Sequence, residues 1–466
     1  MTGFAFMTLA ELSAGLQSRA FSPGELLEDT LSRIEAAEPT LNTFACLDLE
    51  GARRDAAAAT DRQMASGRLS PLDGIPTSVK DLIAQKDLPL RFGSQAMPET
   101  PAAADAPSVA RLRAAGAVLL GKSTTSEFGC KAVGDSPLTG ITRNPWDTDL
   151  TPGGSSCGAA AMVAAGLVPY ALGTDGGGSV RIPAALCGLF GIKGQFGRVP
   201  IYPTSATPTL AHVGPLTRTV ADGAIVMEVI AGFDRRDPFS IAGPVPAYGA
   251  IATTPGKALR IAYSPTLGYA APTPAVLGEV ESAVTAIAAL GHHVEQVDTV
   301  MDDPAPIWTA EFYAGVGTRL FETIRSAPDL IDPAVLDVLR VAIEQNMRSY
   351  YASVFERYAF RDRMRMLFEK YDLLVTPTLP CQAFPVGRDV PPNTPDNAVV
   401  SWTSYTYPFN LTGQPAASVP AGFAGGLPVG LQIVGRSHDE ATIFTLAAQY
   451  QSARSTLDRR PAPLVA

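Results

Sequence analysis

The sequence predicts an α/β fold with a layered core and a helical N-terminal segment. From about residue 70, short apolar runs such as Ala117-Val118-Leu119-Leu120 alternate with helical segments and turns rich in glycine and proline. This alternation is typical of cores built from layers of helices and strands. The chain of 466 residues is 46% hydrophobic and only 17% charged. That composition indicates a compact, well-buried protein and excludes a disordered one.

Residues 1–66 are expected to form helices that pack on the core. Ser22-Pro23-Gly24-Glu25 has the pattern of a helix start, with a capping serine, a proline at the first helical position and a glutamate three residues after the serine. The segment from Asp48 to Ala65 is rich in alanine with alternating charges, which favours a surface helix. Residues 67–222 follow with strand and helix patterns and are expected to form the first part of the core.

Residues 223–350 are predicted to be an insertion with a βαβ-like unit. Leu259–Tyr263 and His293–Val297 have strand patterns, and apolar residues recur at helical spacing between them. Long helices are expected to follow. Residues 351–466 are predicted to return to the core, which restarts at Leu373-Leu374-Val375.

Charge and cysteine content narrow the functional classes. The net charge of −9 argues against nucleic acid or an anionic membrane as a partner. Residues 1–20 lack the cationic start and the apolar stretch of a signal peptide. The five cysteines are scattered along the chain, which indicates reduced thiols. The uncharged stretch Ser156–Gly173 is expected to be a buried helix and a strand, because a membrane span needs about 20 strongly apolar residues. We therefore expect a cytoplasmic protein.

Two glycine-rich turns carry the chemistry. Gly153-Gly154-Ser155-Ser156 forms the first, and the segment from Gly173 to Arg181 forms the second, with Ser179 after three glycines. Turns with few side chains expose backbone N–H groups, which can hold negative charge developing on a carbonyl oxygen. Lys80 stands in an apolar neighbourhood of its own. These are the parts of a hydrolase that works without histidine.

The sequence resembles the amidase signature family of C–N hydrolases. The resemblance lies in Gly74-Ile75-Pro76 leading to Lys80-Asp81, in the two turns, in Gly214–Asp222, and in two C-terminal segments, Asn410–Pro415 and Gly426–Gln432. Long motifs in one order are a stronger signal than a lone short pattern.

The resemblance implies both a fold and an activity. The fold is a single large one, a central mixed, twisted sheet covered by helices on both faces. Residues 67–222 would be the catalytic core, 223–350 would shape the substrate side, and 351–466 would complete the core. The family also implies a cis peptide bond at Ser155 and a proton relay from Ser179 through Ser155 to Lys80. We expect a small-molecule amide or carbamate substrate, no cofactor or metal, and a monomer or homodimer.

The residues themselves suggest the roles in such a reaction. Ser179 is the predicted nucleophile, and Gly176, Gly177 and Gly178, with the Ser179 N–H, are the predicted oxyanion hole. Lys80 can act as a base only when neutral, and burial among apolar neighbours disfavours its ammonium form.

Further residues around the turns are assigned supporting roles. Ser156, Asp175 and Arg181 are expected to hold the nucleophile turn through hydrogen bonds or an ion pair, or to be ordinary turn-stabilising residues. Candidates for the substrate pocket, with core packing as the alternative, are Phe128, Cys130, Tyr202 and Tyr405.

Two features suggest other functions. Gly116–Ser123 matches the phosphate-loop pattern G-x-x-x-x-G-K-S, but its middle residues are themselves the expected strand, so nucleotide or phosphate binding by the glycine loops is the weaker alternative. Cys157 is an alternative nucleophile, but no histidine partner is evident in the sequence, and we expect it to be a small buried thiol.

A third alternative is the glutaminase component of a tRNA-dependent amidotransferase. Ile182 stands where that component usually has glutamine, and Thr207–His212 replaces its usual serine- and aspartate-containing segment. We therefore prefer a stand-alone hydrolase. Cys157 and Ile182 suggest apolar surroundings, which favour apolar or aryl amides, or carbamates.

Overall fold

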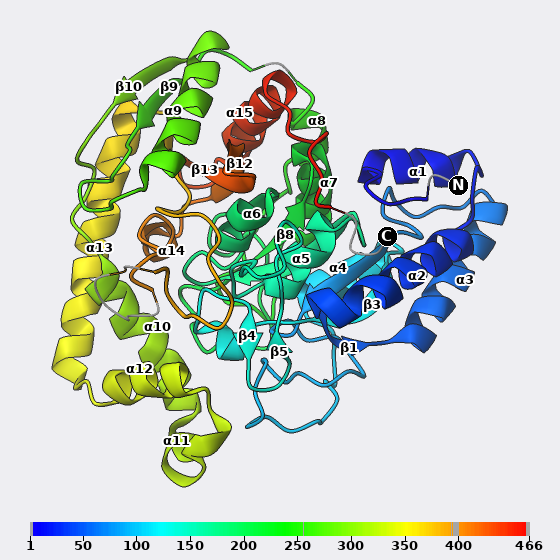
Figure 1. Cartoon of the computed structure of the whole chain (residues 1–466), viewed down its shortest axis with the longest axis horizontal. Coiled ribbons are helices and arrows are strands. Elements are labelled where there is room, and N and C mark those ends of the chain that lie inside the picture. The colour runs from blue at the N-terminus through cyan, green and yellow to red at the C-terminus, as the bar shows by residue number, and fades with distance from the viewer. Residues whose placement is uncertain (1–2, 255, 393, 395–399, 463–466) are drawn as a thin grey trace.

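An eleven-stranded mixed sheet runs through the computed structural model, which describes residues 3–254, 256–392, 394 and 400–462 (Figure 1). In spatial order the strands are β1 Phe44–Leu47, β3 Val118–Ser123, β2 Pro76–Lys80, β6 Tyr170–Asp175, β8 His212–Thr217, β7 Phe190–Lys193, β12 Ala416–Ala424, β13 Leu427–Gly435, β11 Leu373–Pro377, β9 Arg260–Tyr263 and β10 His293–Gln296. Strand β2 pairs in parallel with β3 and β6, whereas β8, β7, β12 and β13 pair antiparallel with their neighbours. A separate hairpin joins β4 Asp135–Ser136 and β5 Gly140–Ile141.

Helices cover both faces of the sheet. Successive side chains of a strand point to opposite faces of the sheet. In β6, Tyr170 and Leu172 belong to the apolar cluster on one face, and Ala171 belongs to the cluster on the other. On the first face lie α4 Pro107–Ala114, α7 Val220–Ile230, α8 Tyr248–Ile251, α9 Pro274–Ala289 and α15 Glu440–Ala453. On the other face lie α5 Cys157–Ala164, α6 Arg181–Cys187, α10 Ala305–Arg319, α12 Pro333–Ile343, α13 Met347–Lys370 and α14 Pro408–Thr412. The α/β fold with a mixed central sheet is confirmed.

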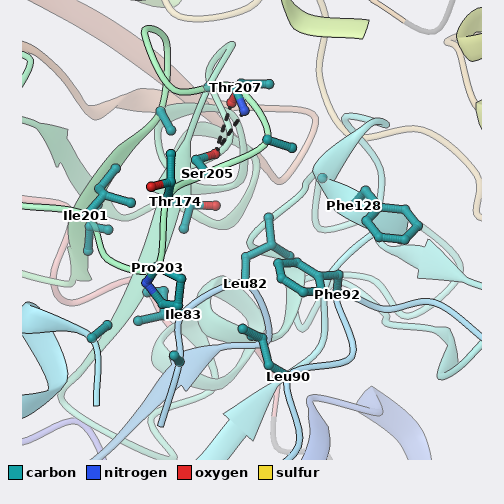
Figure 2. Close-up of a pocket in the computed structure, with 18 of the residues that line it drawn as sticks. Leu82, Ile83, Leu90, Phe92, Phe128, Thr174, Ile201, Pro203, Ser205 and Thr207 are labelled. Carbon is teal, nitrogen blue, oxygen red and sulfur yellow. Dashed lines mark hydrogen bonds between the residues drawn. The ribbon is translucent and has the colours of Figure 1, made fainter. Parts of the chain in front are cut away.

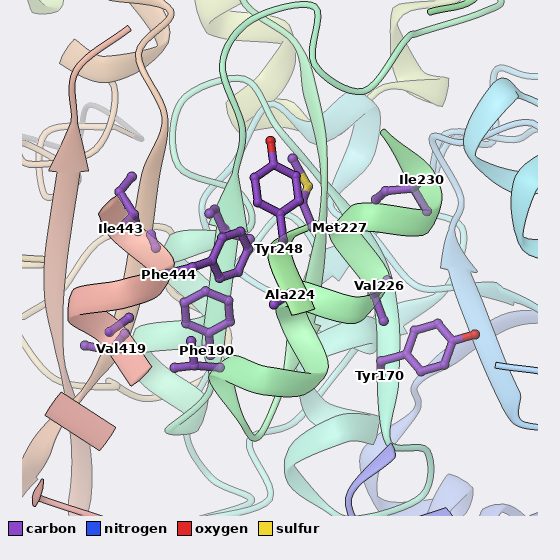
Figure 3. Close-up of a cluster of buried hydrophobic side chains, with 14 of the residues drawn as sticks. Tyr170, Phe190, Ala224, Val226, Met227, Ile230, Tyr248, Val419, Ile443 and Phe444 are labelled. Carbon is purple, nitrogen blue, oxygen red and sulfur yellow. The ribbon is translucent and has the colours of Figure 1, made fainter. Parts of the chain in front are cut away.

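Aromatic side chains fill the core beneath α7 and α15 (Figure 3). The ring of Phe444 lies 5.8 Å from that of Phe190 and 5.1 Å from that of Tyr248, measured between ring centroids. Val226 and Met227 of α7 belong to the same buried cluster. Full burial of a side chain of this size contributes about 1.5–3 kcal/mol, so this layer fixes α7 and α15 on the sheet.

The N-terminal segment is helical except at one strand. It contains α1 Leu9–Gln17, α2 Pro23–Leu41 and α3 Leu49–Met64. The predicted start of α2 is confirmed, since Ser22 and Glu25 form reciprocal capping hydrogen bonds. The expectation of helix throughout residues 1–66 is wrong at Phe44–Leu47, which forms β1 and pairs antiparallel with β3. Phe44–Leu47 forms hydrogen bonds with the edge of β3, and in so short a segment this strand pairing outweighs the local helix propensity.

Residues 223–370 contain the predicted strand–helix–strand unit. Strands β9 and β10 pair in parallel, β9 also pairs in parallel with β11, and α9 lies between β9 and β10 in the chain. The long helices expected after this unit are present as α10, α12 and α13, the last of which ends at Lys370. The short helix α11 Phe321–Ser326 lies between α10 and α12. Two short 3₁₀ turns lie at Glu127–Gly129 and Pro328–Leu330.

The segment that matches the phosphate-loop pattern is a strand. Lys122 and Ser123 belong to β3 and are buried, and Nζ of Lys122 lies 3.0 Å from Oδ1 of Asp81. A phosphate loop must present its lysine to a ligand, and this lysine is paired inside the core. The uncharged stretch Ser156–Gly173 contains α5 and most of β6, as predicted. In the part of the chain that the structure describes, no helix has the length and apolar character to span a membrane.

Candidate active site

Parallel pairing of β2 and β6 brings two distant motifs together. Lys80 is the last residue of β2, and Thr174 and Asp175 end β6. Parallel neighbours have their carboxyl ends at the same edge of a sheet, where the following loops form a site. The turn with Ser179 follows β6 directly, and the Ser155 turn precedes α5, which packs against the same strands. The sheet thus places Lys80 and both serine turns at one edge.

Lys80 is fully buried and contacts two hydroxyl groups. Its Nζ lies 2.6 Å from Oγ of Ser155 and 3.0 Å from Oγ1 of Thr174. Burial lowers the pKa of Lys80 from its ordinary 10.5 to about 7, with weaker opposing effects of Cys157 and Asp175. A lysine with such a pKa exchanges its proton near neutral pH.

The turn that carries Ser155 is tightly enclosed. The Gly154–Ser155 peptide bond is cis, as the family resemblance implied. A Cβ atom at Gly154 would lie 2.2 Å from the carbonyl oxygen of Val133, so only glycine fits there. Oγ of Ser156 donates to the Thr174 carbonyl and accepts from the Thr174 N–H, both at 3.2 Å. Ser156 therefore joins its turn to the end of β6.

A buried carboxylate organises the Ser179 turn. Asp175 accepts hydrogen bonds from the N–H groups of Gly178 (2.8 Å) and Val180 (3.3 Å), and it forms an ion pair of 2.8 Å with Arg181. Burial alone would raise the pKa of Asp175, but the Arg181 guanidinium holds it well below its usual range. Asn410 donates to the same carboxylate at 2.9 Å. Asp175 and Arg181 thus bond within the turn that they were predicted to hold.

The three glycines of this turn differ in the hydrogen bonds that their backbone N–H and carbonyl groups form. The Gly178 N–H is already bound to Asp175, which corrects the expectation that it serves an oxyanion. The Gly176 carbonyl accepts from Nε1 of Trp308 (2.9 Å), and the Gly177 carbonyl accepts from the Thr406 hydroxyl (2.6 Å). Among the hydrogen bonds of the described residues, none uses the N–H of Gly176, Gly177 or Ser179. Those amides are the ones left to bind a ligand.

A pocket opens onto this site, with a volume of about 210 Å³. Ser155, Thr174, Gly176 and Ser179 form its polar end, and Ser179 is half-buried. Figure 2 shows its walls, in which the segment from Ile201 to Thr207 faces the segment from Leu82 to Phe92. Other apolar side chains that line it are Met97, Tyr202, Phe312, Val316 and Leu320.

Two aromatic rings stack in the pocket wall. Phe92 and Phe128 lie 5.9 Å apart between ring centroids, with their planes inclined by 20°. Both have left-handed backbones, with φ of 55° and 50°, and the Phe128 N–H donates to the Phe92 carbonyl at 2.8 Å. Left-handed conformations are rare for bulky residues and are typical of functional sites. Their backbones thus hold the two rings as one aromatic surface.

The structure separates the four predicted pocket residues into two pairs. Phe128 and Tyr202 line the pocket. Cys130 and Tyr405 do not, because both are buried in the core between the sheet and α10–α14, where the Tyr405 hydroxyl donates to the Pro265 carbonyl at 2.6 Å.

The expectation that Cys157 and Ile182 make the site apolar is likewise wrong, since neither lines the pocket. Cys157 is a small buried thiol, as predicted, and lies 3.6 Å from the Thr124 hydroxyl.

Sequence reasoning missed several residues of the site. Thr174 lies inside the motif from Gly173 to Arg181, and the parallel pairing of β2 with β6 would have placed it beside Lys80. Trp308 and Phe312 come from α10, more than a hundred residues after the motif, and no local pattern marks them. Of the Ile201–Thr207 wall only Tyr202 was predicted to line the pocket, because the segment carries no motif. Its last residue falls in the segment that departs from the amidotransferase pattern.

The comparisons with known proteins agree with this geometry. A family model described as Amidase matches residues 25–444. An acylamidase of Rhodococcus erythropolis is 37% identical, over 98% of this chain and 97% of that protein. The A component of the glutamyl-tRNA(Gln) amidotransferase of Chloroflexus aggregans is 36% identical, over 99% of both. The solved structure of a bacterial aryl acylamidase of the amidase signature family matches with a TM-score of 0.91 and 28% identity, over 98% of this chain and 97% of that one.

Fold, site and relatives together define an enzyme that hydrolyses C–N bonds. The chain belongs to the amidase signature family. It is an amidohydrolase, and enzymes of this family act on small-molecule amides.

Proposed function

We propose that this amidase cleaves small amides with an apolar or aryl group, and related carbamates, through an acyl-enzyme on Ser179. The observation that carries the proposal is an apolar pocket that ends at Ser179, Ser155 and Thr174, directly beside a buried lysine. The similarity to an acylamidase and to an aryl acylamidase supports the same class of substrate.

Ser179, Ser155 and Lys80 share the proton transfers in this proposal. Ser179 Oγ attacks the substrate carbonyl carbon while its proton passes to Ser155 Oγ, and the Ser155 proton passes to neutral Lys80. Lys80 Nζ lies 2.6 Å from Ser155 Oγ, and a hydrogen bond from the Ser156 N–H to the Ser179 carbonyl (3.2 Å) joins the two turns. As the C–N bond breaks, the proton returns along the same path to the departing nitrogen. Water then attacks the Ser179 ester by the same route and releases the acid.

Backbone amides stabilise the charge in this reaction. The tetrahedral intermediate places a negative charge on the former carbonyl oxygen, and the N–H groups of Gly176, Gly177 and Ser179 are the donors we assign to it. Loss of one such donor typically costs about 3 kcal/mol of transition-state stabilisation. The bond from Trp308 to the Gly176 carbonyl supports this role, because it fixes the peptide plane that carries the Gly177 N–H.

The pocket lining argues against glutamine as the substrate. Glutamine carries an ammonium and a carboxylate on its α-carbon, and a buried ammonium needs an acidic partner. The described residues that line the pocket include Arg319, which suits a carboxylate, but no aspartate or glutamate to pair with the ammonium. Apolar side chains and the Phe92–Phe128 rings are instead suited to an alkyl or aryl group.

A substrate panel tests this proposal. We expect kcat/KM for anilides and arylacyl amides to exceed that for glutamine by at least about 100-fold, since polar atoms buried without partners are strongly rejected. Phe92→Ala should lower kcat/KM for aryl substrates about tenfold, the value of an aromatic contact. Phe233→Ala changes an exposed phenylalanine outside the pocket and should leave kcat/KM for the same substrates unchanged. Preference for glutamine, or equal effects of the two variants, would contradict the assignment.

A further inference from the structure

Helix α13 is apolar on two opposite faces. Its inner face contributes Phe360, Met364 and Phe368 to the core. Its outer face carries five of the exposed large apolar side chains, which we call the α13 stripe: Met347, Tyr351, Phe355, Tyr358 and Met366. Figure 1 shows α13 as the outermost element along one side of the molecule. A surface helix normally has a polar outer face, and a helix apolar all round is normally buried.

The stripe follows one straight line along the helix. Its first four members are four, four and three residues apart, which keeps them on one face at 3.6 residues per turn. Tyr351 lies 6.2 Å from Phe355 between ring centroids, as expected of neighbours on that face. From Met347 to Met366 the stripe spans about 28 Å at 1.5 Å per residue. The exposed fractions of its side chains lie between 50% for Met366 and 77% for Met347.

We propose that the α13 stripe is a homodimer interface, in which α13 packs antiparallel to α13 of a second copy. A two-fold interface requires a patch that is complementary to itself, and four of the five stripe residues form two pairs that are symmetric about the point between residues 356 and 357. Around that point Phe355 faces Tyr358 of the other copy, and Met347 faces Met366. Tyr351 faces Asp362, which offers its carboxylate to the phenol hydroxyl.

The charges beside the stripe favour a protein partner over a lipid surface. Arg363 is paired with Glu356 at 2.8 Å, and Arg365 is paired with Asp362 at 2.8 Å and also with Glu369. Arg348 and Arg361 of the same helix form no ion pair among the described residues, but Glu356, Asp362 and Glu369 place three carboxylates beside the stripe, and an anionic membrane would repel them. An apolar centre of Tyr, Phe and Met with a mixed-charge rim is the usual anatomy of a protein interface.

The size of the stripe fits a modest dimer interface. A fully buried aromatic side chain removes about 150–250 Å² from water, so five half- to three-quarters-exposed side chains offer roughly 600 Å² per copy. Two copies then bury about 1,200 Å², which is the lower limit for a specific, stable interface. None of the five stripe residues lines the pocket, so the proposed contact does not involve the residues assigned to the reaction.

Sedimentation of the full-length protein tests the interface. We expect the wild type to associate, with increasing concentration, to twice its chain mass of 48.8 kDa. Phe355→Arg should weaken association by about 100-fold or more, because it places a charge at the centre of the contact. Phe233→Arg, at a phenylalanine that is 56% exposed elsewhere, should associate like the wild type. Equal melting temperatures for all three proteins would show that the fold is intact.

Cysteine pairs test the antiparallel arrangement. Met347→Cys combined with Met366→Cys should give a reducible covalent dimer on mild oxidation, whereas either substitution alone should not exceed the wild-type background. Cross-linking by Met347→Cys alone would indicate a parallel arrangement and overturn the register. A wild type that stays at single-chain mass, or a Phe355→Arg variant that still dimerises, would overturn the interface. Phe355-dependent binding of single chains to anionic vesicles would assign the stripe to a membrane.

Discussion

The protonation of Lys80 gives the sharpest prediction for this enzyme. Lys80 is buried and contacts Ser155 and Thr174, and burial lowers its pKa from 10.5 to about 7. Only the neutral amine can accept a proton from Ser155, so activity requires Lys80 in its deprotonated form. The protonated fraction falls as pH rises through the pKa, and turnover must therefore rise with pH in the same window.

The shift in pKa sets the size of the effect. The lowering of the Lys80 pKa from 10.5 to about 7 means that burial disfavours the ammonium form relative to the neutral amine by about 5 kcal/mol. At pH 8 about 90% of Lys80 would be neutral, against about 0.3% for an unshifted lysine. We expect kcat/KM to rise about tenfold per pH unit below pH 7 and to level off above it.

Initial rates on an anilide between pH 5 and pH 9 measure this profile. Lys80→Arg keeps a cation of similar length but cannot lose its proton near neutral pH, so it should be inactive across the whole range while folded. Circular dichroism and the melting temperature check the fold. A flat profile between pH 6 and 8, or substantial turnover by Lys80→Arg, would refute the assignment of Lys80 as the base.

Three further predictions follow from the same site. Ser155→Ala should lower kcat by about 10²–10⁴ because it interrupts proton transfer; a variant with unchanged rate in the same assay would contradict the relay. Arg181→Met leaves the carboxylate of Asp175 buried without its partner, so the free energy of unfolding in urea should fall by about 3–5 kcal/mol, and an unchanged midpoint would disprove that role. Cys157→Ala should keep near wild-type kcat, since Cys157 does not line the pocket; loss of turnover with an unchanged melting temperature would point to the thiol.

Local sequence predicted the parts of the site that lie within single motifs. Lys80, the Ser155 turn and the Ser179 turn each stand at the end or start of one element, and glycines mark both turns. The structure brings them together through parallel pairing of β2 with β6. It also shows what motif reading could not, namely that the Gly178 N–H is already bound to Asp175.

The pocket walls were harder to predict, for a physical reason. Tyr405 and Cys130 are close in sequence to Asn410 and Phe128, but sequence distance does not fix the direction in which a side chain points. Both point into the core. The true walls come from segments that only the tertiary fold brings beside Ser179, such as α10 and the Ile201–Thr207 loop. Strand β1 was missed likewise, because the partner that stabilises it lies on β3.

The most direct test of the proposed reaction is the mass of the intact protein after incubation with a fluorophosphonate. An activated serine should give a single adduct on the wild type, and Ser179→Ala should give none. Lys80→Arg should also react slowly, because the nucleophile would lack its base. Equal labelling of the wild type and Ser179→Ala, or an adduct mapped to Ser155, would contradict Ser179 as the nucleophile.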